Sequence, residues 1–216
     1  MTGKPQFCYS ALPRSGTGPG VLVLHAWWGL NHFTREYCQR LAGEGFVALA
    51  PDLYGGKIAT TIEEAQRLRS SLNQKLVRAD ILAALEQLRS LPSVSSDSLG
   101  VIGFSLGANY ALWLSQEKPE LIKAVALYYG TKGGDYASAQ GAYLGHFAES
   151  DEWVATSGVK KLEKSLRAAG RPVTFYTYSG TGHWFCEADR PEAYNPAAAQ
   201  LAWVRTVEFL RAQLCQ

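Results

Sequence analysis

The sequence lacks an apolar run long enough to cross a membrane, and it carries almost no net charge. A bilayer span needs about 20 consecutive, mainly apolar residues. The formal net charge of the 216 residues is +2, and no basic stripe interrupts this balance. A partner such as nucleic acid or an anionic membrane surface would require such a stripe. We therefore predict that the chain binds neither nucleic acid nor membrane; the sequence leaves the oligomeric state open.

Cysteine is also scarce. The four cysteines, Cys8, Cys38, Cys186 and Cys215, are scattered without CxxC spacing, so neither a metal site nor a disulfide framework is indicated. The first residues do not form the apolar stretch of a signal peptide. Free thiols are typical of the reducing cytoplasm. The sequence thus predicts a cytoplasmic protein that needs no metal and no organic cofactor.

The length and the apolar pattern predict one α/β domain over residues 1–216. With 47% hydrophobic residues, the chain can bury a substantial core without disulfides or metals. Short apolar runs alternate with longer helical patterns, which is typical of a parallel sheet covered by helices on both faces. Strands are expected over residues 21–25, 46–50, 99–102, 123–129, 142–147 and 172–178. Helical patterns cover residues 31–43, 62–91, 106–114, 159–169 and 197–214.

Ser105 lies in a pentapeptide that follows the apolar run at 99–102. Gly103-Phe104-Ser105-Leu106-Gly107 matches the Gly-x-Ser-x-Gly elbow, in which a serine occupies a strained turn between a strand and a helix. Glycines at the outer positions are expected because the turn leaves no room for side chains there. The helix predicted from Leu106 would place its backbone amide at a helix N-terminus, where it can stabilise an oxyanion. The pattern predicts a nucleophilic serine.

Two further candidate catalytic residues follow later strands of the predicted sheet. Asp151 comes after the strand expected at 142–147, and His183 comes after the strand expected at 172–178. In open parallel sheets, ligands bind at the carboxyl ends of the strands, and Ser, Asp, His is the chain order of the α/β-hydrolases. A serine needs a base to remove its proton, and histidine titrates near neutral pH. We expect His183 to be that base and Asp151 to orient it.

Other polar residues near these positions compete for roles. Glu149 and Glu152 are close enough in sequence to replace Asp151. Asp52 precedes the serine and is expected to stabilise a turn instead. Cys186 has neither an elbow nor a helix N-terminus that would lower its pKa, so it is not expected to be a nucleophile. Structural roles are expected for His25, His32 and His146.

With these residues located, the chain resembles the dienelactone hydrolase family from Val21 to Leu210. The resemblance is carried by the elbow and by the segments His25–Asn31, Ala50–Gly56, Gly182–Phe185 and Arg190–Tyr194, the last leading to Ala202-Trp203. It implies an α/β-hydrolase fold with a mostly parallel central sheet of about seven strands and helices on both faces. It also implies that the backbone amide of Trp27 joins that of Leu106 in an oxyanion hole.

The chain departs from this family at three positions. Members that act on dienelactone resemble one another in having a cysteine where this chain has Ser105 and a glutamate where it has Ala26. They hold the carboxylate of their substrate with arginines, one of which corresponds to Glu187 here. A carboxylate at Glu187 is expected to repel an anionic substrate, although Arg190 is available nearby.

Aromatic residues in the predicted loops indicate the kind of ligand. We expect Trp28, Tyr54, Trp153 and Trp184 to line the substrate pocket together with Ala26, and such a lining favours neutral, flat or apolar ligands. The resulting prediction is a serine hydrolase that acts on small-molecule esters or lactones through an acyl-enzyme intermediate. A dienelactone-type lactone hydrolase is the alternative within enzymes. A non-catalytic binding protein on the same fold is the alternative outside them.

Overall fold

The computed structural model of the protein describes residues 8–215, in which strands and helices alternate. The strands are β1 (Cys8–Ala11), β2 (Gly20–Leu24), β3 (Val47–Pro51), β4 (Leu99–Phe104), β5 (Ile122–Tyr128), β6 (Ala142–Ala148) and β7 (Val173–Tyr178). The helices are α1 (His32–Gly43), α2 (Ile62–Ser70), α3 (Gln74–Arg89), α4 (Leu106–Glu117), α5 (Thr156–Ala168) and α6 (Pro196–Leu214).

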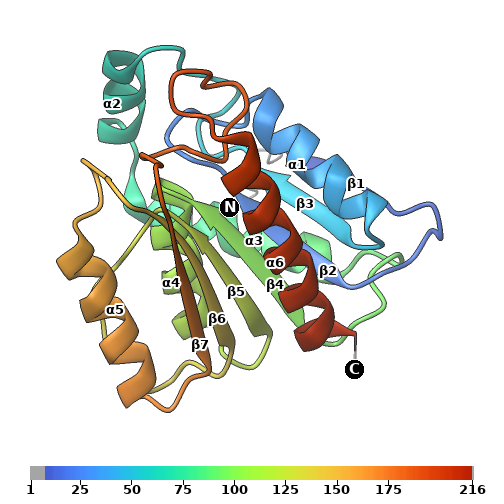
Figure 1. The fold of residues 1–216 in the computed structure, drawn as a ribbon. Coiled ribbons are helices and arrows are strands. Elements are labelled where there is room, and N and C mark those ends of the chain that lie inside the picture. The colour runs from blue at the N-terminus through green and yellow to red at the C-terminus, as the bar shows by residue number, and fades with distance from the viewer. Residues whose placement is uncertain (1–7, 216) are drawn as a thin grey trace.

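The strands form one sheet in the order β1-β3-β2-β4-β5-β6-β7, and only β1 is antiparallel to its neighbour. Helices α1 and α6 cover one face, and α3, α4 and α5 cover the other (Figure 1). Each face buries its own apolar core against the strands. The predicted α/β architecture, with helices on both faces of a mostly parallel sheet of seven strands, is confirmed.

Two elements differ from the sequence-based expectation. The continuous helical pattern over 62–91 is two helices, because Asn73 accepts hydrogen bonds from the amides of Lys75 and Leu76 and so begins α3. Asparagine favours such a cap over a helix interior, while the apolar spacing continues across the break. Strand β1 was not predicted, because its four residues pair only at the edge of the sheet and carry no apolar run.

The segment after β3 is shaped by two buried polar side chains. Asp52 accepts hydrogen bonds from the amides of Tyr54, at 2.9 Å, and Gly56. His25 Nε2 accepts from the amide of Leu53 at 3.2 Å. Both residues therefore organise a turn, as their sequence contexts suggested. From this turn the chain leads to α2, which stands over the carboxyl edge of the sheet (Figure 1).

A buried hydrogen-bonded chain ties β5, β6 and β7 to α6. Arg205 donates to the hydroxyl of Tyr178 at 3.1 Å, and this hydroxyl lies 2.7 Å from His146 Nδ1. His146 Nε2 lies 2.9 Å from Thr206 Oγ1, which is hydrogen-bonded to the hydroxyl of Tyr128 at 2.7 Å. Burial lowers the pKa of His146 to about 3, and the charge of Arg205 acts in the same direction. His146 is therefore neutral and structural.

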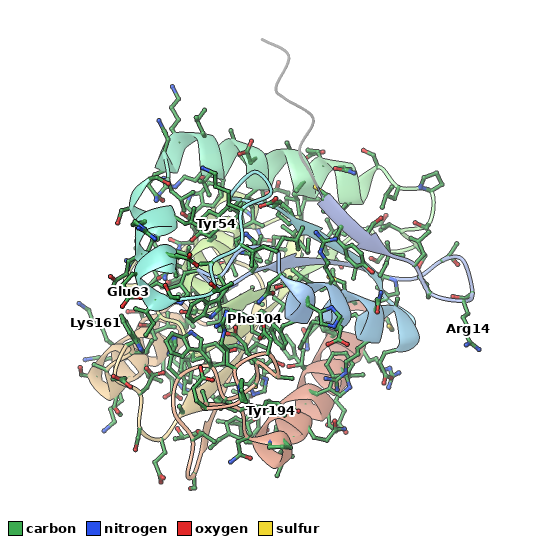
Figure 2. All side chains as sticks on the ribbon, turned by 90° about the horizontal axis from the view of Figure 1, so that it is seen from above. Arg14, Tyr54, Glu63, Phe104, Lys161 and Tyr194 are labelled. Atoms are coloured by element: carbon green, nitrogen blue, oxygen red, sulfur yellow. The ribbon has the colours of Figure 1, made fainter. Side chains whose placement is uncertain are left out.

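Seen from above, Phe104 lies near the middle of the molecule, while Arg14 and Lys161 lie at its periphery (Figure 2). Phe104 is the last residue of the central strand β4. The turn at Ser105 therefore follows directly from a strand in the middle of the sheet. No helix within residues 8–215 is both long and apolar enough to cross a membrane.

Candidate active site

Ser105 occupies a strained turn between β4 and α4. Its φ of 48° lies in the left-handed region that only glycine adopts freely, and its amide is fixed by the carbonyl of Tyr128 at 2.9 Å. The outer glycines allow close packing around this turn. A Cβ at Gly103 would lie 2.4 Å from the Gly107 carbonyl oxygen, and a Cβ at Gly107 would lie 2.1 Å from that of Leu24. The elbow therefore requires both glycines.

The three candidate residues of the site meet in one hydrogen-bonded line. Ser105 Oγ lies 2.9 Å from His183 Nε2, and His183 Nδ1 lies 2.7 Å from Asp151 Oδ2. The side chains of His183 and Asp151 are only 3% and 5% exposed, so water barely screens their interaction. A carboxylate at this place holds the proton on Nδ1 and leaves Nε2 free to accept one from the serine.

Asp151 is itself fixed by the loop that carries it. Its Oδ1 accepts hydrogen bonds from the amides of Trp153 at 2.8 Å and Val154 at 2.9 Å. The competing Glu149 instead accepts from the amide of Gly180 at 2.9 Å, which joins the loops after β6 and β7. Glu152 is exposed. Of the three acids, Asp151 is the one that the structure brings to His183.

The two backbone amides expected to form an oxyanion hole are those of Leu106 and Trp27. Leu106 is the first residue of α4, where amides have no acceptor within the helix. Within residues 8–215, the amide of Trp27 donates no hydrogen bond to the protein. The packing of Gly107 against the carbonyls of Leu24 and His25 brings the N-terminus of α4 to the end of β2. The role of these two amides in an oxyanion hole stays a prediction.

A cavity of about 150 Å³ opens beside Ser105 and His183. Its walls come from the loop after β2, from α2 and α4, and from the loops after β5, β6 and β7. The lining residues are Trp27, Arg69, Ser105, Leu106, Asn109, Tyr129, Gly130, Thr131, Trp153, Val154 and His183.

Of the residues expected to line the pocket, Trp153 does so and the others do not. Ala26, Trp28, Tyr54 and Trp184 are buried in the core, between 2% and 9% exposed. Trp28 and Trp184 pack on each other with ring centroids 5.2 Å apart. All four residues lie in loops, as predicted. A loop position does not determine which side chains face the cavity.

The charges around the pocket also differ from the expectation. Glu187 does not line the cavity; it is fully buried, and burial raises its pKa to about 8, so it is uncharged at neutral pH. The expected repulsion of anions by Glu187 is therefore wrong. Arg190 stacks on Trp28, 3.7 Å from the ring centroid. The cation that does line the cavity is Arg69, from the end of α2, which no sequence signal singled out.

The cavity is also lined by four residues that no sequence motif marks, Asn109, Tyr129, Gly130 and Thr131. The last three directly follow β5, so the rule that ligands bind at the carboxyl ends of strands could have found them. Cys186 is buried, and burial raises the pKa of its thiol well above the usual range. That environment disfavours the thiolate, in line with the expectation that Cys186 is not a nucleophile.

The elbow at the end of a central strand, on a mostly parallel sheet with this strand order, places the chain among the α/β-hydrolases. A solved structure described as "Crystal Structure of Putative Dienelactone Hydrolase from Klebsiella pneumoniae subsp. pneumoniae MGH 78578" superposes with a TM-score of 0.85, at 25% identity, and covers 96% of this chain and 93% of that one.

The chain belongs to the dienelactone hydrolase family, whose sequence profile it matches over residues 8–214. It is 34% identical to "Protein usf" of Aquifex pyrophilus, over 95% of this chain and 93% of the relative. It is 32% identical to the "Putative carboxymethylenebutenolidase" of Aquifex aeolicus, again over 95% and 93%. The resemblance noted in the sequence is thus confirmed at the level of the family.

Proposed function

We propose that the protein is a serine-dependent hydrolase of carboxylic esters or lactones that works through an acyl-enzyme intermediate. The observation that carries the proposal is the line from Ser105 through His183 to Asp151, with separations of 2.9 Å and 2.7 Å, at the wall of a cavity. Membership of a hydrolase family supports the same reaction class.

The mechanism follows from the geometry. Ser105 Oγ attacks the carbonyl carbon while its proton passes to His183 Nε2, and Asp151 stabilises the imidazolium that forms. The oxyanion of the tetrahedral intermediate accepts hydrogen bonds from the amides of Leu106 and Trp27. When the intermediate collapses, His183 returns the proton to the departing alkoxide. Water, activated by the same histidine, then hydrolyses the acyl-enzyme and frees Ser105.

Covalent labelling tests this proposal directly. The protein is incubated with a fluorophosphonate, and its intact mass is measured beside that of the Ser105→Ala variant. Ser90→Ala, which alters an exposed serine at the end of α3, is the matched control. We expect a one-to-one adduct on the wild type and on Ser90→Ala but none on Ser105→Ala. A folded wild-type protein that takes up no label would instead favour the non-catalytic binding protein.

Arg69 favours a second candidate, a hydrolase of lactones or esters that carry a carboxylate. Arg69 is a cationic residue in the lining of the cavity, and Glu187 lies outside this lining, with its pKa raised to about 8 by burial. We would compare kcat/KM for matched esters with and without a remote carboxylate, in the wild type and in Arg69→Gln. A preference for the charged ester that disappears in Arg69→Gln supports this candidate. Equal values for both esters in the wild type reject it.

A further inference from the structure

Glu187 is a fully buried carboxyl that the proposed mechanism does not use. One oxygen, Oε1, accepts a hydrogen bond from the hydroxyl of Tyr129 at 2.8 Å. The other, Oε2, has no hydrogen-bond partner in the described part of the chain. A buried polar group that is only half paired destabilises a fold. Packing alone therefore gives no reason for a carboxyl here, and its hydrogen-bond partner within residues 8–215 is Tyr129.

Tyr129 holds an unusual position beside the proposed base. It is the first residue after β5, and its φ of 37° is in the left-handed region, where a bulky side chain is strained. The residue belongs to the lining of the cavity, and its ring meets the imidazole of His183 edge-on, with centroids 4.9 Å apart. Strain of this kind persists only where the surroundings fix the residue. Two hydrogen bonds fix Tyr129 here. Its backbone amide donates to the carbonyl of His146 at 2.8 Å, and its hydroxyl donates to Glu187.

The imidazole of His183 is held by ring packing as well as by its hydrogen bonds to Asp151 and Ser105. It lies in a loop with Gly180 and Gly182, which restrict the backbone little. Its imidazole is confined by Tyr129 and also by Trp184, whose ring lies 4.9 Å away, nearly perpendicular to it at 79°. A tilt of the Tyr129 ring would release the imidazole, and the 2.9 Å separation from Ser105 Oγ would not be maintained.

We propose that Glu187 is a positioning residue for hydrolysis, which holds the Tyr129 hydroxyl and thereby fixes the ring that supports His183. The inference rests on the proposed function, since it assigns His183 the role of the base. It requires a hydrogen-bond acceptor at position 187 but no charge. Burial raises the pKa of Glu187 to about 8, so the neutral amide of glutamine reproduces the acceptor that is present at pH 7.

The test compares four variants of the full-length protein at pH 7: Glu187→Gln, Glu187→Leu, Tyr129→Phe and the Glu187→Leu/Tyr129→Phe double variant. Misplacement of a catalytic group by about 1 Å costs on the order of 100-fold in rate. We expect kcat to fall about 10-fold to 100-fold in both Glu187→Leu and Tyr129→Phe, with KM nearly unchanged. The double variant should be no slower than either single one, and Glu187→Gln should retain the wild-type kcat.

Tyr143→Phe is the matched control, because it also removes a buried hydroxyl, one that bonds Ser115 at 2.8 Å in the core beneath α4 and α5. It should lower the melting temperature and leave kcat unchanged. Tyr129→Phe keeps the ring, so it also serves if Glu187→Leu fails to fold. If Tyr129→Phe and Glu187→Leu lower only the melting temperature, as Tyr143→Phe does, the role is structural and the proposal is overturned.

A spectroscopic measurement separates this proposal from the proposed function. The proton between His183 Nδ1 and Asp151, atoms 2.7 Å apart, is expected to give a downfield NMR signal. We expect the wild type and Glu187→Gln to share this signal, and Tyr129→Phe and Glu187→Leu to shift or lose it. That result supports the positioning role even if no ester is hydrolysed, in which case only the proposed function fails. An unchanged signal in all variants overturns the positioning role while leaving hydrolysis intact.

Discussion

The buried His146 should make the stability of the fold depend on pH in a defined direction. An unperturbed histidine has a pKa near 6.5, whereas burial lowers the pKa of His146 to about 3 in the folded protein. Above pH 6.5 His146 is neutral in both the folded and the unfolded protein, so the free energy of unfolding is not reduced by its titration. As the pH falls from 6.5 toward 3, the unfolded chain binds a proton that the folded one does not, so stability is lost.

The size of this loss follows from the interval between the two pKa values. A pH of 4 lies about 2.5 units below the pKa of the unfolded histidine, and each unit is worth about 1.4 kcal/mol, which gives about 3.5 kcal/mol. The partial protonation of the unfolded state at pH 7 and of the folded state at pH 4 reduces the difference between these two pH values to about 3 kcal/mol. His146→Gln cannot take up this proton. It should be less stable than the wild type at pH 7, because it disturbs the bonds to Thr206 and Tyr178, and it should lose about 3 kcal/mol less on acidification.

Urea unfolding followed by circular dichroism at pH 7 and pH 4 measures this difference. All other titrating groups are common to both proteins and cancel when the two pH effects are subtracted. His32→Gln is the control, because it removes an exposed histidine that pairs with Glu36 at 3.4 Å on the surface of α1. If wild type and His146→Gln lose the same free energy between pH 7 and pH 4, the assignment of a buried, neutral His146 is wrong.

Three further outcomes are expected. Asp151→Asn should lower kcat about 10³-fold to 10⁴-fold in an ester assay, because the amide no longer selects the Nδ1–H tautomer of His183; a loss below tenfold would refute that role. Gly107→Ala should abolish folding or cost several kcal/mol, since its Cβ would meet the Leu24 carbonyl oxygen at 2.1 Å; a thermal melt like that of the wild type would contradict the elbow packing. For Glu187, the folded pKa of about 8 exceeds the usual value, so the wild type should lose stability as the pH rises from about 4.5 to 8. Urea unfolding across this interval should show that Glu187→Gln lacks this loss, and equal slopes for the two proteins would argue against a buried carboxyl.

The line of Ser105, His183 and Asp151 could be anticipated from the sequence because each of its signals is local. The elbow is a contiguous pattern, and the other two residues follow apolar strands in an order that few folds share. The choice of Asp151 over Glu149 needed the structure, since both lie in the same short loop and only the hydrogen bonds separate them. Their chemistry is equivalent until the loop is folded.

The lining of the pocket could not be anticipated in the same way. Trp28 and Trp153 look alike in sequence, yet one packs under its neighbours and the other faces the cavity. From the sequence alone, Glu187 is expected to be charged, because a sequence does not reveal that a carboxyl is buried and that burial raises its pKa. Arg69 lies in the last turn of α2, directly before the break that Asn73 ends by capping α3, and the apolar spacing conceals this break.

If Asp151 orients the base as proposed, its carboxylate links substrate selection to turnover. One of its oxygens lies 2.7 Å from His183 Nδ1, and the other accepts hydrogen bonds from the amides of Trp153 and Val154, both of which line the cavity. A substrate or substitution that displaces this wall also displaces the acid, so selectivity gained here would be accompanied by a change in kcat. Arg69, another lining residue, belongs to the separate helix α2, and within residues 8–215 it makes no hydrogen bond to Asp151 or His183. Attempts to redirect this protein toward new substrates should therefore begin at Arg69 and leave the loop of Trp153 intact.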